Sequence, residues 1–327
     1  MKAGGFGVVA IGRNEGRRLG RCLTSAFLSA SRVVYVDSGS SDSSVALARA
    51  LGAEVVELDP ARPFTAARAR NAGFRRLLEI APEVAYVQFV DGDCEFIPGW
   101  LENAQAFLDQ HPEVAVACGR RRERHARLSI YNLLCDMEWD TPAGDARACG
   151  GDAMVRRAAF EASGGFREDL IAGEEPELCL RLRAAGWRIW RLDSDMAWHD
   201  ANLVRFGQWW QRSRRAGHAF AEGAALHGGP PERHWVRESA SALGWGLVLP
   251  LLVAGLAMAG GPGWLALLAL YPLQVARLAW RGRRPSRREN TWRAIFLVLG
   301  KFPEMLGVLT YLDRRLRGGE TRLIEYK

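Results

Sequence analysis

The sequence predicts an α/β protein with a mostly parallel sheet, followed by a helical region that associates with a membrane. Two observations predict the sheet. Short apolar runs alternate with segments of helical periodicity, and three of these runs end in polar loops, where ligands bind in parallel sheets. A third observation predicts the membrane region, because two long apolar runs follow Leu243.

Length and composition allow two domains. A chain of 327 residues with 48% hydrophobic residues and 12 tryptophans can fill a sizeable core. We expect a first domain over residues 1–228 and a C-terminal region over residues 229–327. The net charge of +7 comes from clustered arginines, which indicate an anionic partner such as phosphate, nucleic acid or an anionic membrane. The clusters lie at Arg120–Arg127, Arg205–Arg215 and Arg277–Arg293.

The six cysteines show neither a Cys-x-x-Cys pair nor zinc-site spacing. We therefore expect reduced, mostly structural thiols in a reducing compartment. The first residues, Met1 to Gly7, lack the basic start and apolar run of a signal peptide. The front of the chain is accordingly expected in the cytoplasm.

The first ninety residues alternate between strand and helix patterns. Gly12 to Gly16 breaks the first strand, and Ser43 or Ser44 can cap a helix that closes at Gly52. In order, we expect a strand over Gly7–Ile11, a helix carrying Leu19 to Ala30, strand Val33–Val36, the capped helix, strand Ala53–Leu58, helix Phe64–Glu79 and a strand that begins at Tyr86.

That last strand ends in Asp91-Gly92-Asp93, around which the rest of the chain is organised. Two carboxylates this close repel each other unless a cation lies beside them, and Gly92 leaves room for a ligand to approach. A hard divalent metal that also holds a phosphate is the natural partner. The alternative is a loop with two solvated acids.

The middle of the chain is less regular. Pro176 suits the first turn of a helix that Gly186 stops, so Glu174 and Glu175 lie at its positive end. The other elements we expect are helix Pro98–Gln110, strand Glu113–Gly119, a basic loop over Arg120–Arg127, strand Gly150–Val155 and strand Trp187–Leu192, with His199 shortly after.

The C-terminal region predicts a membrane hairpin over residues 243–280, made of two apolar runs of about 17 residues around a Gly-Pro turn. Flanking arginines place both ends of the hairpin in the cytoplasm. Residues 291–313 are apolar but interrupted by Lys301, Pro303 and Glu304, which favours an interfacial helix. The alternative is a buried helical hairpin of a soluble protein.

Seven stretches between residues 7 and 200 stand in a recognisable order: VVAIGRNEGRRLGRCL, VVYVDSGSSDSS, ARARNAGF, FVDGDCEF, GGDAMVRRAAFEASGGF, GEEPELCLRLRAAGW and WHD. Together they resemble the family-2 glycosyltransferases. The resemblance implies the GT-A fold, a Rossmann-like, mostly parallel sheet. The hydrophobic tail resembles that of membrane-anchored bacterial members that build surface polysaccharides or glycolipids.

The resemblance implies that the first two strand-end loops hold a nucleotide. Asp37 would read the base, Asp91 would contact the ribose and Asp152 the donor sugar. Arg70 would face the nucleotide, its alternative being a solvated helix arginine. The remaining residues that would shape the pocket are Asn14, Glu15, Ser40 and Asp42.

The resemblance also implies a metal and a catalytic base. Asp93 would bind Mg²⁺ or Mn²⁺, and His199 would complete the site. The family's usual Glu-Asp before the Leu-x-x-Arg-Leu helix is Glu174-Glu175 here. Glu175 stands at the Asp position and is the expected base, with Glu174 as the alternative; both could instead only cap the helix.

The sequence thus predicts an inverting, metal-dependent transferase that moves a sugar from a UDP- or GDP-sugar to a hydroxyl of a glycan or lipid-linked acceptor. It would be held at the inner membrane with its catalytic domain in the cytoplasm, with no nucleic-acid partner. Two alternatives stay open: a sugar nucleotidyltransferase, and a membrane-anchored nucleotide- or sugar-binding protein without turnover.

Overall fold

The computed structural model describes residues 5–282, 284 and 286–318, so the expectation about the first residues falls partly outside it. The chain forms two compact units that divide after Asn202, whereas the sequence places the boundary after residue 228. The difference arises because α8 (Phe206–His227) packs along α13 (Lys301–Arg317) within the second unit. Gly217 permits this packing, since a Cβ there would lie 1.9 Å from the carbonyl oxygen of Glu304.

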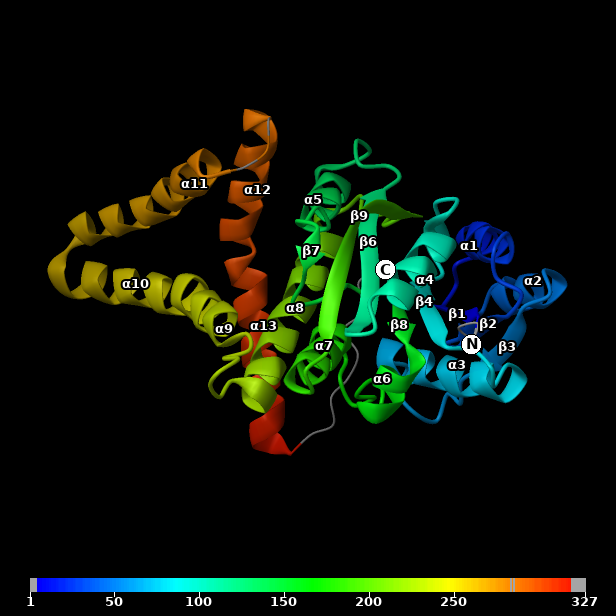
Figure 1. Cartoon of the computed structure of the whole chain (residues 1–327). Helices are drawn as coiled ribbons and strands as arrows, with labels where there is room; N and C mark the ends of the chain where they lie inside the picture. The colour runs from blue at the N-terminus through cyan, green and yellow to red at the C-terminus, as the bar shows by residue number, and fades with distance from the viewer. Residues whose placement is uncertain (1–4, 283, 285, 319–327) are drawn as a thin grey trace. The chain divides into compact units, whose positions relative to one another are not determined.

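One nine-stranded sheet organises the first unit (Figure 1). Its strand order is β3-β2-β1-β4-β8-β6-β9-β5, with β7 paired to β9. Strands β1, β2, β3, β4, β6 and β9 share one direction, which confirms the predicted mostly parallel sheet. The strands are β1 (Phe6–Gly12), β2 (Val33–Asp37), β3 (Glu54–Glu57), β4 (Tyr86–Asp91), β5 (Cys94–Phe96), β6 (Val114–Glu123), β7 (Gly144–Asp145), β8 (Ala153–Arg156) and β9 (Arg188–His199).

Helices cover both faces of this sheet, and successive residues of one strand enter two separate cores. Val9 and Ile11 of β1 face the core that includes residues of α3 and α7. Val8 and Ala10 face the core that includes residues of α1 and α4. The helices of this unit are α1 (Arg17–Phe27), α2 (Ser44–Ala50), α3 (Ala66–Ile80), α4 (Trp100–Gln110), α5 (Ile130–Glu138), α6 (Arg157–Ala162) and α7 (Glu174–Ala184).

Strands β6 and β9 extend further than the sequence indicates. The basic composition of Arg120–Arg127 predicts a loop, yet β6 continues to Glu123 and β9 continues to His199. The extension forms because the two strands pair to their ends, with Glu123 opposite His199. Backbone pairing therefore outweighs local composition here, and it carries both side chains to one edge of the sheet.

The second unit is helical. Residues Val236–Gly260 form one helical run made of α9 (Val236–Leu243), η1 (Gly244–Val248) and α10 (Leu249–Gly260), and η2 (Pro262–Ala269) and α11 (Leu270–Trp280) follow the turn at Gly261. The helix expected over residues 291–313 is divided between α12 (Arg287–Leu299) and α13.

Two stretches of this unit, Val236–Gly260 and Arg287–Arg317, are long and apolar enough to cross a membrane. Only 17% and 33% of their apolar windows are buried in the described structure, whereas the core helix of a soluble protein is mostly buried. This favours membrane association. Whether the second stretch crosses a bilayer or lies on it stays a prediction.

The close packing of α3 on the sheet predicts opposite outcomes for two glycine substitutions. A Cβ at Gly73 would lie 2.3 Å from Val9 Cγ1 and 2.8 Å from Val36 Cγ2, and overpacking of this kind costs roughly 1–3 kcal/mol. At Gly20 of α1 the nearest atom, Leu47 Cδ2, is 3.5 Å away, so the advantage of Ala over Gly in a helix, about 1 kcal/mol, remains. Calorimetry of the full chain should give a lowered Tm for Gly73→Ala and an equal or higher Tm for Gly20→Ala. Equal Tm values for the two variants would contradict the tight packing of α3.

Candidate active site

The carboxyl ends of β1, β2 and β4 lie side by side at one edge of the sheet. In the parallel ladders Gly12 pairs with Asp37, and Ile11 pairs with Asp91. The three polar loops that follow these strands therefore start from neighbouring positions. This is the convergence that the sequence predicts for a ligand-binding edge.

Hydrogen bonds join the first two loops. The backbone N–H of Asn14 donates to Ser40 Oγ (2.9 Å), and Asn14 Oδ1 accepts from the backbone N–H of Ser41 (2.7 Å). Asn14 has a φ of 56°, a left-handed conformation in which Asn is enriched. Glu15 forms an ion pair with Arg18 at 2.8 Å. These contacts build one rigid rim from two distant segments.

Asp37 is buried under donors from its own chain. The hydroxyls of Tyr35 (2.9 Å) and Ser40 (2.5 Å) donate to its Oδ1, and the N–H groups of Gly39 and Ser40 donate to its Oδ2. Burial, followed by the charge of Asp37, raises the pKa of Tyr35, which keeps the phenol a donor. Asp42 similarly accepts from the first N–H of α2 (2.9 Å). Both carboxylates therefore shape the loop, and a nucleotide base would have to replace one of the donors on Asp37.

Arg70 of α3 bridges two of the predicted site acids. Its Nη2 lies 2.8 Å from Asp91 Oδ1, and its Nη1 lies 2.7 Å from Glu174 Oε1. Burial alone would lower the pKa of Arg70, but the two carboxylates raise it above its ordinary value. The buried side chain is therefore held as a charged bridge between Asp91 and Glu174, rather than as the solvated helix arginine that the sequence left as the alternative.

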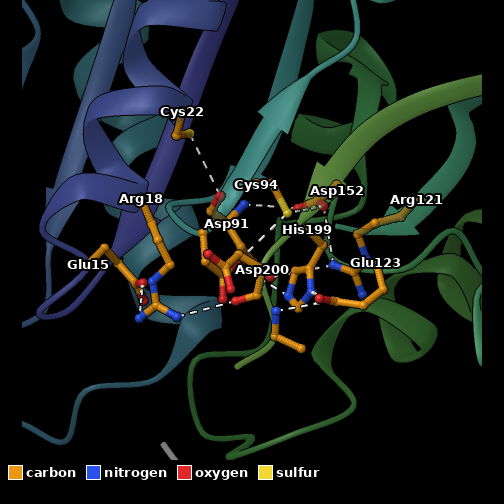
Figure 2. Close-up of polar contacts among 12 residues, drawn as sticks. Glu15, Arg18, Cys22, Asp91, Cys94, Arg121, Glu123, Asp152, His199 and Asp200 are labelled. Carbon is orange, nitrogen blue, oxygen red and sulfur yellow. Dashed lines mark hydrogen bonds and ion pairs between the residues drawn. The ribbon is translucent and has the colours of Figure 1, made fainter. Parts of the chain in front are cut away.

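Asp152 is a second buried node (Figure 2). It accepts from the backbone N–H of Asp91 (2.9 Å), from the Cys94 thiol (3.0 Å) and from Arg121 Nη1 (3.2 Å). The Arg121 guanidinium lies 4.0 Å from the centre of the Trp139 ring. Burial, and then the charges of Asp152 and Asp93, raise the pKa of Cys94, so this thiol stays protonated as a donor.

Asp93 and His199 form a site with the geometry of a metal centre. His199 Nε2 lies 3.4 Å from Asp93 Oδ1, and His199 Nδ1 lies 3.0 Å from Glu123 Oε2 (Figure 2). Two neighbouring donors about 2.1 Å from an octahedral ion are about 3.0 Å apart, so the observed separation would close by a few tenths of an ångström on binding. The pairing of β9 with β5 sets Cys94 opposite His199, which brings the imidazole to Asp93. The residues thus fit a divalent cation, with Glu123 fixing the orientation of the ring.

Glu175 lies at the start of α7 in a different environment from its neighbour Glu174. Its Oε1 accepts from the backbone N–H of Cys149 (2.5 Å) and from the Cys179 thiol (3.0 Å). Burial raises the pKa of Glu175, partly offset by these hydrogen bonds. A buried carboxylate with a raised pKa is suited to accept a proton near neutral pH.

The sequence profile described as "Glycosyl transferase family 2" matches residues 8–163, most of the first unit. The first unit belongs to glycosyl transferase family 2. The chain is accordingly a glycosyltransferase with a GT-A fold. No curated protein matches its sequence.

Solved structures share the fold of this glycosyltransferase. The mannosyltransferase PcManGT from Pyrobaculum calidifontis, in complex with GDP-Man and Mn²⁺, is 20% identical with a TM-score of 0.62, over 93% of this chain and 86% of that chain. TarS residues 1–349 from S. aureus is 16% identical with a TM-score of 0.51, over 96% and 92%. Glucosyl-3-phosphoglycerate synthase from Mycobacterium tuberculosis, in complex with phosphoglyceric acid, is 18% identical with a TM-score of 0.50, over 70% and 81%.

Three residues of this glycosyltransferase site escaped the sequence analysis. Glu123 and Arg121 fall in a stretch whose basic composition suggests a loop, although a single acid among the five arginines of residues 120–127 is itself a signal. Cys94 directly follows the Asp91-Gly92-Asp93 motif, and the spacing of the six cysteines predicts only a structural thiol there. Their contacts with Asp152 and His199 depend on strand pairing, which composition does not reveal.

The buried Glu123–His199 contact predicts that Glu123→Gln weakens Mn²⁺ binding by roughly 10- to 100-fold. Glu123 Oε2 accepts from His199 and from the N–H of Ala201, and its Oε1 accepts from the N–H of His125. In Glu123→Gln the side-chain NH₂ group would face the N–H donors of either His199 and Ala201 or His125, and it cannot accept a hydrogen bond from them. Calorimetric titration with Mn²⁺ measures the change, with Glu113→Gln at a half-exposed ion pair as the control. An unchanged Mn²⁺ affinity for Glu123→Gln would contradict His199 as a ligand.

Proposed function

We propose that this chain is an inverting, metal-dependent glycosyltransferase that moves a sugar from a UDP- or GDP-sugar to an acceptor hydroxyl. The acceptor is a glycan or a lipid-linked molecule, in polysaccharide or glycolipid synthesis. The Arg70 bridge carries the proposal. It ties Asp91 to Glu174 at the start of α7, and this supports a donor site near Asp91 with the neighbouring Glu175 close to it.

Glu175 is the proposed general base, and the contacts favour it over Glu174. Glu174 is ion-paired with Arg70 at 2.7 Å, so this carboxylate is already held in the bridge to Asp91. Glu175 makes no ion pair with Arg70; its Oε1 accepts instead from a backbone amide and a thiol. Its burial favours the protonated product of that transfer.

The proposed reaction is a single displacement. The acceptor oxygen forms a bond to the anomeric carbon of the donor sugar, and its proton passes to Glu175. The bond from the anomeric carbon to the diphosphate breaks on the opposite face, so the anomeric configuration inverts. Asp93 and His199 would hold a Mg²⁺ or Mn²⁺ ion, which when bound supplies neutralising charge for the leaving diphosphate.

The nucleotide would lie on the rim formed by the first two loops. Asp37 and Ser40 present the edge that meets the base, and Asp91 meets the ribose. Asn14, Glu15 and Asp42 hold the loops in place, and Asp152 fixes the backbone of Asp91 from below. GDP-Man and Mn²⁺ in the P. calidifontis mannosyltransferase support this class of donor and cation.

The second unit would hold the enzyme at the inner membrane with its catalytic unit in the cytoplasm. The two apolar helical stretches support this placement. Arg233 and Arg237 lie at the N-terminal end of the first stretch and Arg287 begins the second, and positive charge is retained on the cytoplasmic side of a bilayer.

The base assignment predicts that Glu175→Gln abolishes transfer while nucleotide binding persists. The test incubates the full chain in detergent with a panel of UDP- and GDP-sugars and Mg²⁺ or Mn²⁺, and measures release of nucleoside diphosphate. We expect a loss of about 10²-fold or more for Glu175→Gln, and a smaller loss for Glu174→Gln. If a nucleotide bound but no nucleoside diphosphate were released from any donor, a binding protein without turnover would be favoured instead. Formation of a nucleotide-sugar from a sugar phosphate would favour a nucleotidyltransferase.

The environment of Glu175 also predicts the pH dependence of transfer. Because burial raises its pKa above the ordinary value of 4.5, the deprotonated base is lost at a higher pH than for an exposed Glu. The plot of kcat/KM against pH should therefore fall on the acid side with a midpoint above 4.5. A midpoint at the ordinary Glu value would contradict a buried base.

A further inference from the structure

A second cluster of metal-ligating atoms surrounds the proposed base. Cys149 Sγ and Cys179 Sγ lie 3.6 Å apart, and Cys179 Sγ lies 3.0 Å from Glu175 Oε1. The ligand atoms of these three residues all lie within 4.8 Å of one another. Two sulfurs and one carboxylate oxygen are a donor set that Zn²⁺ and softer divalent cations prefer.

The spacing fits a tetrahedral ion. Two sulfurs each about 2.3 Å from Zn²⁺ would be about 3.8 Å apart, close to the observed separation, and an oxygen about 2.0 Å from the ion would lie about 3.5 Å from each sulfur. The observed 3.0 Å requires only a small side-chain shift. Glu175 and Cys179 are one helical turn apart on α7, so they share one face. Cys149 comes from the loop before Gly150, whose φ of 84° marks a turn.

We propose that Cys149, Cys179 and Glu175 form an inhibitory site for Zn²⁺ or a similar thiophilic ion. Binding replaces the two thiol protons with metal–sulfur bonds and takes Glu175 as the third ligand, with water in the fourth position. Mg²⁺ binds poorly to sulfur ligands, so we expect it at Asp93 and His199 and not at the two cysteines. The inhibitory effect rests on the proposed function of Glu175, whereas metal binding does not.

The binding test uses Cd²⁺ as a probe, because its thiolate bonds absorb in the ultraviolet. The full chain, reduced and saturated with Mg²⁺, is titrated with Cd²⁺. We expect one tight ion per chain with two thiolate bonds. Loss of an outer-shell partner already costs about 10- to 100-fold in affinity, so Cys149→Ser and Cys179→Ser should each weaken binding by about 100-fold or more. Cys94→Ser is the matched control, because Cys94 belongs to the group with Asp93 and His199.

The same variants separate the metal site from its effect on transfer. Added Zn²⁺ should block transfer at saturating Mg²⁺, a chelator should restore it, and Cys149→Ser should resist Zn²⁺ relative to its own uninhibited rate. A Cd²⁺ signal lost in Cys94→Ser but kept in Cys149→Ser overturns the proposal. Loss of the free thiols of Cys149 and Cys179 without bound metal would indicate a disulfide between them and would also overturn the proposal. Cd²⁺ bound at Cys149 and Cys179 with transfer unaffected overturns the inhibitory role and the assignment of Glu175 as base, and leaves the metal site standing.

Discussion

The site depends on one buried guanidinium held between two carboxylates. Arg70 comes from α3, Asp91 from the end of β4 and Glu174 from the start of α7, so a single side chain joins three segments of the fold. Removing one partner of a buried ion pair leaves an uncompensated charge and costs about 3–5 kcal/mol. The bridge therefore holds the end of β4 and the start of α7 together.

The carboxylates of several acids in the site already accept hydrogen bonds from other groups of the protein. Asp37 receives two hydroxyls and two amides, Asp152 receives an amide, a thiol and Arg121, and Glu123 holds His199. Such carboxylates have fixed positions before a substrate arrives. The side chains that they hold, such as Arg121 and His199, are therefore fixed in position as well.

Two neighbouring glutamates illustrate how environment divides roles. Glu174 and Glu175 are consecutive residues at the positive end of α7. Glu174 is ion-paired with Arg70, whereas Glu175 is buried beside two thiols. Burial raises the pKa of Glu175, and the hydrogen bonds that partly offset this rise come from the residues that would bind a thiophilic ion. Two groups of possible metal ligands thus lie in one unit and differ in their donor atoms. Cys149, Cys179 and Glu175 offer two sulfurs and an oxygen, and Asp93, Cys94 and His199 offer an oxygen, a sulfur and a nitrogen.

The sequence by itself determined the alternation of strands and helices, the polar loops at the sheet edge and the paired acids Asp91 and Asp93, whereas Glu175 became a candidate through the family resemblance. These are local properties, because hydrophobic period and turn residues act over a few positions. Only the tertiary structure decided that Glu123 supports His199, 76 residues away, and that Cys149 meets Cys179 across 30 residues. Strand register and helix packing set such pairs, and no local pattern encodes which distant residues a sheet will place side by side.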